Sequence, residues 1–583
     1  MLRTILRQVG KYRTRALLTP MWTTLEVIVE MLIPYVTAFI IDRGIYGGEV
    51  GAIARYGTLM IALASLGLLF GYLAARFAAY SSTGLAANLR GAMYRNIQRF
   101  SFSDIDKFSA AGLVTRMTTD VSSVQNAFQM LLRTTFRAPL NLISSLVMCF
   151  VINASLSVIF LIAMVILMTF LTILITRAAK LFRQILLKVD AVNSTVRENV
   201  DAIRVVKAFA SESGEISKFD KAALSLYTLN IRAEGLMALN HPVMNLVLNG
   251  AIIALSWYGA HFIVEGSLTT GQLTSLFSYI TTTLGSMMML SMIFVQLTQS
   301  IASAERIAAV ITEEPDMFDP EDPVSEVPDG RVDFNHVSFA YGESSDNALS
   351  DIDLHIAAGE TIGIIGGTGS GKSSLVSLIP RLYDATEGSV EVGGIDVRRY
   401  SMKALRSKVA MVLQKNTLFS GTILDNLRWG DENATREQCI EACKAASADE
   451  FISAFPEGYD TVIAEGGSNV SGGQRQRICI ARALLKKPKV LILDDSTSAV
   501  DTATDARIRE TFRTIFPGVT KIIVSQRILS IKDADRILVL EGGKVSGFDS
   551  HQRLLETSDV YREIYNLQTS GGEGDFDEKG GGV

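Results

Sequence analysis

The stretch Thr361-Ile362-Gly363-Ile364-Ile365-Gly366-Gly367-Thr368-Gly369-Ser370-Gly371-Lys372-Ser373 decides the fold of the C-terminal half of the chain. Its first five residues predict a buried strand, and the eight that follow fit the pattern G-x-x-x-x-G-K-S. Such a loop joins a strand to a helix, and its glycines let backbone N–H groups wrap around phosphates. We therefore predict a nucleotide phosphate site, in which Lys372 reaches the β- and γ-phosphates and Ser373 binds Mg²⁺.

A second hydrophobic strand supplies the acidic group that a phosphate-bound metal ion needs. The sequence Leu491-Ile492-Leu493-Asp494-Asp495 ends on two carboxylates, and Asp494 is the predicted metal partner. Together the two strands predict an α/β nucleotide-binding domain.

Composition divides the chain into two halves of different kinds. At 583 residues it is too long for one domain, and 48% hydrophobic with 20% charged residues is an apolar balance, with a mean hydropathy of +0.28. Long charge-free windows fill the first half, whereas the second half has the composition of a soluble domain. The net charge of −5 gives no basis for nucleic-acid binding. The four cysteines show no disulfide framework.

The first half contains enough apolar sequence for six membrane-spanning helices. One spanning helix needs about 20 mostly apolar residues. The segments that meet this need are 21–41, 56–75, two helices within 138–176 that part near Asn153, 241–264 and 266–304.

Basic residues predict the orientation of these helices. Arginine and lysine are concentrated before the first helix and in the stretches 76–137 and 177–234, while the other loops hold few. Because such residues gather on the cytoplasmic side, we predict a multi-pass protein of the cell membrane with its N-terminus and second half in the cytoplasm. The two long connections are predicted to be helices that continue roughly 35–40 Å beyond the bilayer.

Four side chains of the membrane half are candidates for a substrate cavity. Glu26 and Glu30 lie one turn apart on the first helix, where charges are costly and face a cavity or a partner. A structural ion pair or an interfacial position is the alternative for both. Met288 and Met292 lie in a methionine-rich part of the last helix, and thioethers suit a promiscuous apolar surface. Ordinary helix packing is the commoner explanation for such a cluster.

An acidic, proline-rich stretch separates the two halves. We predict a basic cytoplasmic helix at 1–15, a six-helix membrane domain at 16–310, a linker at 311–330 and a nucleotide-binding domain at 331–568. The glycine-rich, acidic tail at 569–583 is predicted to be disordered.

The motifs of the second half resemble those of ABC transporters in order and spacing. Val470-Ser471-Gly472-Gly473-Gln474-Arg475-Gln476-Arg477 is similar to the ABC signature, and Ser498-Ala499-Val500-Asp501 is similar to the D-loop. Gln414 resembles the Q-loop glutamine, and Tyr341 the aromatic residue that stacks on adenine. The first half resembles the exporter-type membrane domain. The implied fold class is therefore multi-domain, with an all-α six-helix transmembrane domain followed by an α/β P-loop nucleotide-binding domain.

The resemblance implies ATP and Mg²⁺ as the ligands of this domain. Tyr341, Gln414 and the loop from Gly366 to Ser374 would bind ATP, and Ser373, Gln414 and Asp494 would hold Mg²⁺. In the family two such domains close head to tail, so Ser471, Gly472, Gly473 and Gln474 would clasp the ATP of the partner chain.

Two positions depart from the family pattern. The residue after the Walker B aspartate is Asp495, where glutamate is normal, and the switch residue is Gln526, where histidine is normal. Aspartate is one methylene shorter, and a carboxylate that stands back by ~1–1.5 Å can lose ~10²-fold in rate. Glutamine still donates a hydrogen bond, but it cannot carry imidazolium charge or move a proton. We therefore predict a degenerate site that retains nucleotide and hydrolyses it poorly, beside an intact signature.

These observations predict one subunit of a heterodimeric ABC exporter of apolar or amphipathic small molecules, embedded in membrane lipid and paired with a second half-transporter. The alternatives are a regulatory nucleotide-binding membrane subunit with little turnover and a homodimeric slow exporter. Coupling is predicted at the helical tips near 103–108 and 211–219, with Phe108 or Phe219 inserted into a nucleotide-binding domain.

Overall fold

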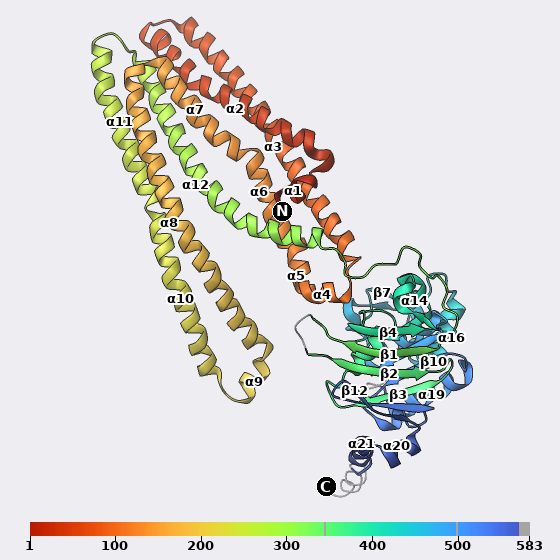
Figure 1. Cartoon of the computed structure of the whole chain (residues 1–583). Helices are drawn as coiled ribbons and strands as arrows, with labels where there is room; N and C mark the ends of the chain where they lie inside the picture. Colours follow the sequence, from red (N-terminus) through yellow and green to blue (C-terminus); the bar gives the residue numbers. More distant parts are fainter. Residues whose placement is uncertain (343–345, 497–499, 571–583) are drawn as a thin grey trace, which may run out of the picture. The chain divides into compact units, whose positions relative to one another are not determined.

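The chain forms two compact units in a computed structural model that describes residues 1–342, 346–496 and 500–570 (Figure 1). The helical unit comprises Met1–Gln98 and Ser109–Glu313. The α/β unit comprises the residues from Glu314 onward and, in addition, the short segment Arg99–Phe108. A piece of the first half of the sequence therefore folds as part of the second unit.

The helical unit has the long apolar helices that the sequence predicts. Five segments of the described residues are long and apolar enough to cross a membrane, namely Gly10–Tyr46, Val50–Ile97, Ala110–Ile152, Ala154–Asp201 and Glu212–Val264. A sixth long helix, α12, covers the last predicted span. The helices of this unit are α1 (Leu2–Arg7), α2 (Arg13–Phe39), α3 (Val50–Ile97), α5 (Ala110–Thr115), α6 (Val121–Leu132), α7 (Thr134–Ile152), α8 (Ala154–Asp201), α9 (Ile203–Ala208), α10 (Glu212–Ala238), α11 (Asn240–Val264) and α12 (Thr270–Thr312).

Local capping explains where these helices end. Asn153 takes an extended conformation and its side chain accepts a hydrogen bond from the Leu156 N–H, which ends α7 and begins α8 at the predicted break. Thr269 and Gln272 form a capping box at the start of α12. The segment 1–15, predicted as one helix, instead consists of α1, a 3₁₀ turn at Gly10–Tyr12 and the start of α2. Gly10 has a φ of 49°, a left-handed conformation that interrupts the helix.

The core of the helical unit joins the first and last long helices to those between them. Val27 and Met31 of α2 pack in one cluster with Phe160 of α8, Leu255 of α11 and Tyr279 of α12. The Tyr279 hydroxyl donates to the Met31 carbonyl at 2.6 Å, so its buried polar atom is satisfied.

The α/β unit is built on a six-stranded sheet with the strand order β12-β11-β3-β10-β9-β6. Within this sheet β11, β3, β10, β9 and β6 run parallel, and β12 is antiparallel to β11 at the edge. A four-stranded antiparallel sheet with the order β2-β1-β4-β5 lies beside it. The strands are β1 (Val332–Phe339), β2 (Leu349–Ile356), β3 (Thr361–Gly366), β4 (Glu387–Val392), β5 (Ile395–Asp396), β6 (Val409–Val412), β7 (Gly421–Thr422), β8 (Val462–Ile463), β9 (Val490–Asp494), β10 (Thr520–Val524), β11 (Arg536–Glu541) and β12 (Lys544–Asp549).

Alternation along the central strands buries both faces of this sheet. Ile492 of β9 points into the core shared with the antiparallel sheet, while Leu491 and Leu493 point into the core covered by helices. The helices of the unit are α4 (Phe102–Phe108), α13 (Lys372–Leu378), α14 (Met402–Lys408), α15 (Ile423–Arg428), α16 (Arg436–Ala445), α17 (Asp449–Ser453), α18 (Gly472–Leu485), α19 (Thr502–Ile515), α20 (His551–Thr557) and α21 (Asp559–Ser570). Of the tail predicted for 569–583, the first two residues end α21, and the remainder lies outside the described residues.

Candidate nucleotide site and its coupling contacts

The predicted phosphate loop lies between β3 and α13, as the strand–loop–helix pattern requires. Gly371 has a φ of 92°, and a Cβ there would lie 2.6 Å from the Ala348 carbonyl, so only glycine fits. A Cβ on Gly367 or Gly369, by contrast, would meet no atom within 4 Å. The loop is therefore tight on its protein side and open on the side that a phosphate would occupy.

Lys372 reaches back over this loop. Its Nζ donates to the carbonyl of Gly366 at 2.9 Å and to that of Gly367 at 2.7 Å. Burial lowers the pKa of Lys372, against the attraction of Asp494 and Asp495. Carbonyl oxygens neutralise little of this charge, so the lysine remains a cation available to phosphate.

The two predicted metal ligands lie next to each other: Ser373 is in the first turn of α13, and Asp494 is the last residue of β9. The Ser373 hydroxyl donates to Asp494 Oδ1 at 3.1 Å. Burial raises the pKa of Asp494, the neighbouring Asp495 raises it further, and the hydrogen bond from Ser373 and the charge of Lys372 oppose that rise. The Asp494 carboxylate and the Ser373 hydroxyl are oxygen ligands of the kind that Mg²⁺ prefers.

Asp495 and Gln526, the two unusual residues, meet beside the phosphate loop. Gln526 Nε2 donates to Asp495 Oδ2 at 3.3 Å, and a side-chain hydrogen bond links Asp495 to Gln414. Asp495 has a φ of 46°, a left-handed conformation that aspartate tolerates better than most residues. Burial raises its pKa, while the bond from Gln414 and the charges of Lys372 and Arg527 oppose the rise.

Tyr341, the predicted adenine-stacking residue, lies over the start of α13. Its hydroxyl hydrogen-bonds the Ser374 hydroxyl at 2.8 Å, and its ring is edge-on to Phe339 with centroids 4.8 Å apart. A third ring, that of Tyr383, is edge-on to Tyr341 at 5.3 Å. The sequence prediction did not include Tyr383, which follows α13 in Arg381-Leu382-Tyr383-Asp384 and matches no phosphate motif.

Tyr383 also contacts the short helix α4, which comes from the first half of the sequence. Its hydroxyl donates to Asp106 Oδ2 at 2.9 Å, and its ring lies 6.0 Å from that of Phe102. Phe108, one of the two residues predicted to insert into a nucleotide-binding domain, is buried, and its ring stacks on that of Phe100 with centroids 5.6 Å apart. The segment 99–108 therefore contacts the rest of the α/β unit through Phe102 and Asp106.

The signature residues form the N-terminus of α18. The Ser471 side chain accepts from the Gln474 N–H at 3.2 Å, and the Gln474 side chain accepts from the Ser471 N–H at 2.9 Å. This capping box leaves the first N–H groups of a 14-residue helix, including those of Gly472 and Gly473, at its positive end. Such an end is suited to bind an anion.

The D-loop residue Asp501 caps α19, and its side chain accepts from the Thr504 N–H at 2.9 Å. This backbone bond lowers the pKa of Asp501. Ser498 and Ala499 of the same motif lie outside the described residues.

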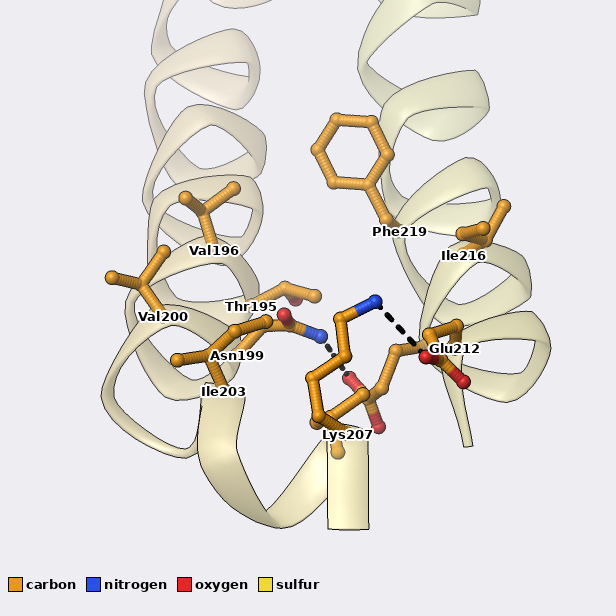
Figure 2. A pocket seen from close by; sticks show the side chains of 11 residues that line it. Thr195, Val196, Asn199, Val200, Ile203, Lys207, Glu212, Ile216 and Phe219 are labelled. Atoms are coloured by element: carbon orange, nitrogen blue, oxygen red, sulfur yellow. Dashed lines mark hydrogen bonds and ion pairs between the residues drawn. The ribbon is translucent and has the colours of Figure 1, made fainter. Parts of the chain in front are cut away.

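The second predicted tip, near 211–219, belongs to the helical unit and surrounds a cavity of about 320 Å³ between α8, α9 and α10 (Figure 2). Two polar pairs join its walls: Lys207 Nζ with Glu212 Oε1 at 2.9 Å, and Asn199 Nδ2 with Glu215 Oε2 at 3.0 Å (Figure 2). Phe219, the other residue predicted to insert, lines this cavity rather than the end of the tip.

The membrane candidates Glu26 and Glu30 are both paired with arginine. Arg137 donates to Glu26 Oε1 at 2.8 Å and to Glu30 Oε1 at 2.6 Å, and Arg133 lies 3.4 Å from Glu26 Oε1. Glu26 is 5% exposed, and a Cβ on Gly71 would come within 2.8 Å of its Oε1. The glutamates thus tie α2 to α7, the structural alternative that the sequence left open.

The methionine candidates lie along α12. Met287 is fully buried, and Met288 packs against the same cluster of Leu142, Leu167 and Met244. The side chain of Met292 lies outside what the structure describes. Met288 therefore contributes to helix packing.

Comparison with known proteins agrees with this architecture over nearly the whole chain. The family of the ABC transporter transmembrane region matches residues 18–287, and the ABC transporter family matches residues 349–498. The chain is 38% identical to the uncharacterized ABC transporter ATP-binding protein YfiB of Bacillus subtilis (strain 168), over 93% of this chain and 94% of that protein. It is 33% identical to an ATP-dependent lipid A-core flippase of Desulfotalea psychrophila, over 82% of this chain and 83% of the flippase.

A solved structure is similar over the same extent. A bacterial Atm1-family ABC exporter with ATP bound superimposes with a TM-score of 0.80 at 25% identity, and the match covers 95% of this chain and 99% of the exporter. The chain therefore belongs to the ABC transporter family and is a half-transporter of the exporter type, a multi-pass membrane protein with a cytoplasmic ATP-binding domain.

Proposed function

We propose that this half-transporter is one subunit of a heterodimeric exporter, whose own ATP site retains nucleotide and hydrolyses it slowly. The observation that carries the proposal is the meeting of Asp495 with Gln526 at 3.3 Å beside the phosphate loop. A general base needs a free lone pair aimed at the attacking water and a route for the proton that it takes. Here the short carboxylate is held by two amides, those of Gln414 and Gln526, and neither amide can take up a proton.

The residues expected to bind ATP are present despite the unusual Asp495 and Gln526. The phosphate loop, Lys372 and Tyr341 would supply the contacts to phosphate and adenine, and Ser373, Gln414 and Asp494 would hold Mg²⁺. Held by these residues, Mg²⁺ would supply positive charge that offsets part of the phosphate charge. The site is thus built to hold the ligand while the group that should activate water is too short.

The signature supports a division of labour with a second chain. Ser471 and Gln474 form a complete cap on α18, so this chain offers an intact anion-binding helix end to a partner's ATP. In a head-to-tail dimer the partner's ATP would meet this intact surface, and hydrolysis would take place chiefly there.

The transported compounds are proposed to be apolar or amphipathic. One relative is named for the flipping of lipid A-core, which is an amphipathic lipid. Glu26 and Glu30, the two acidic residues of α2, are paired with Arg137, so we do not assign them to a charged cargo.

Two other assignments make different predictions from the same residues. A homodimeric slow exporter would place the weak base and the intact signature at both sites, so this chain purified alone would form a dimer and hydrolyse ATP slowly without a second chain. A regulatory subunit would bind ATP and gate a partner, and the assembled complex would show almost no turnover. Co-purification with the product of the neighbouring gene, followed by ATPase assay, separates these possibilities.

A matched pair of variants tests the proposal in that complex. Ser471→Arg blocks the surface offered to the partner's ATP and should abolish hydrolysis. Asp495→Asn removes the carboxylate of this chain's own site and should lower total hydrolysis far less. Full activity in Ser471→Arg, or equal loss in both variants, would contradict the proposed asymmetry.

A further inference from the structure

The C-terminal helix α21 ends against the loop that carries Gln526. Gln568 Nε2 donates to the Gln526 carbonyl at 2.7 Å, and the Ile528 N–H donates to Gln568 Oε1 at 2.9 Å. One side-chain amide therefore holds the backbone on both sides of Arg527. It uses both its donor and its acceptor, which fixes its orientation as well as its position.

The helix that presents Gln568 is itself firmly seated. Tyr561 is fully buried, and its hydroxyl lies 2.6 Å from His551 Nδ1 of α20. Ile564 and Tyr565 pack against the core that contains Ile528. Residues 561, 564, 565 and 568 share one face of a helix by their spacing, so burial of the first three directs Gln568 to the loop.

The inner side of the same loop is fixed by the sheet. The Ser525 N–H donates to the Ile364 carbonyl at 3.1 Å, and the Asp495 N–H donates to the Val524 carbonyl at 3.0 Å. Gln526 follows Ser525, which is bonded to the sheet, and its own carbonyl is bonded to Gln568. From this position its side chain reaches Asp495. Loss of the hydrogen bonds from Gln568 would therefore move the side-chain amide of Gln526 relative to the Asp495 carboxylate.

We propose that Gln568 is a positioning residue for Gln526, through which the end of the C-terminal helix sets the contact of the switch loop with bound ATP. This inference rests on the proposed function, and on the resemblance to ABC transporters, by which the switch residue Gln526 would face the γ-phosphate of bound ATP. The expected consequence is specific to the terminal phosphate, because Tyr341 and the loop from Gly366 to Ser374 would hold the adenine and the inner phosphates.

The test compares MgATP with MgADP on the full chain in lipid nanodiscs, by titration calorimetry. Gln568→Leu keeps the size of the side chain and removes both hydrogen bonds, so the affinity for MgATP should fall by roughly three- to tenfold. The affinity for MgADP should not change. Gln568→Glu retains the acceptor for the Ile528 N–H and loses the donor to Gln526, so it should show a smaller fall.

Two further variants separate positioning from a general loss of structure. Leu567→Ala alters the neighbouring residue, which is 70% exposed, and should leave both affinities unchanged. In a Gln526→Ala background, Gln568→Leu should have no further effect on MgATP, because the side chain to be positioned is gone. An equal loss for both nucleotides, a loss that persists in Gln526→Ala, or no loss at all would overturn the inference. If Gln526→Ala alone leaves the preference for MgATP unchanged, the role proposed for Gln526 fails, and the inference fails with it.

Discussion

Replacement of Tyr383 by phenylalanine should weaken the connection between α4 and the ATP site without weakening ATP binding. The change removes only the hydroxyl that donates to Asp106 at 2.9 Å. The ring contacts with Phe102, Phe339 and Tyr341, with centroids 5.3 to 6.0 Å apart, remain. Burial, the hydrogen bond to Asp106 and its charge all raise the pKa of Tyr383, so the phenol stays a donor at physiological pH.

The size of the effect follows from the exposure of the acceptor. A hydrogen bond to a charged group contributes about 1.5–3 kcal/mol to stability when it is shielded from water. Asp106 is exposed, so screening by solvent reduces this to about 1 kcal/mol. That free energy corresponds to roughly a fivefold change in the equilibrium between docked and undocked α4.

The assay is the stimulation of ATP hydrolysis by membrane lipid in the complex with its partner. Tyr383→Phe should reduce this stimulation severalfold, relative to the detergent-solubilised complex, at an unchanged affinity for MgATP. Phe102→Ala should do the same, since it contacts Tyr383 from α4. Tyr383→Ala also removes the ring beside Tyr341 and should lower both quantities. Normal stimulation in Tyr383→Phe and in Phe102→Ala would refute the reasoning.

The remaining predictions concern the ATP site that we propose to be weak and the ion pairs of the membrane helices. Asp495→Glu combined with Gln526→His should raise hydrolysis at this chain's site by at least about tenfold, because general-base positioning contributes about 10²–10⁴-fold. The measurement needs a partner whose own Walker B glutamate is replaced by glutamine, and a flat response opposite a normal partner signature would mean that other residues limit the site. Arg137→Leu should lower the free energy of unfolding of the helical unit by up to about 3 kcal/mol, because Glu30 loses its ion pair with Arg137 and Glu26 keeps only the longer contact with Arg133. The combination of Glu26→Gln, Glu30→Gln and Arg137→Met should recover the melting temperature, and a melting temperature unaffected by Arg137→Leu would argue against a structural role.

Local sequence patterns predicted the parts of the fold that depend on neighbouring residues. The strand–loop–helix around Gly371 follows from glycine conformation and strand hydrophobicity, and the break at Asn153 follows from a capping residue between apolar runs. The proximity of Gln414, Asp495 and Gln526 also followed, because each belongs to a motif whose place in the family fold is fixed.

Contacts between distant segments could not be predicted in this way. Tyr383 and Asp106 lie 277 positions apart, and Gln568 lies 42 positions from Gln526. Local sequence patterns do not show which distant residue each of these side chains meets, because that depends on how α4 and α21 pack. The prediction that Phe108 inserts into a nucleotide-binding domain stays a prediction, and the contact that the structure shows for its ring is the stacking on Phe100.

The length of α3 and α8 has a mechanical consequence. Each is a single uninterrupted helix of 48 residues, and at 1.5 Å per residue each is about 72 Å long. Such a rod acts as a lever, because a tilt of about 5° at one end displaces the other by roughly 6 Å over this length. A small rotation at one end thus becomes, at the far end, a displacement larger than the ~5.4 Å pitch of the helix. The bending stiffness of α3 and α8, rather than any single side-chain contact, would then determine how much of a displacement at one end reaches the other end.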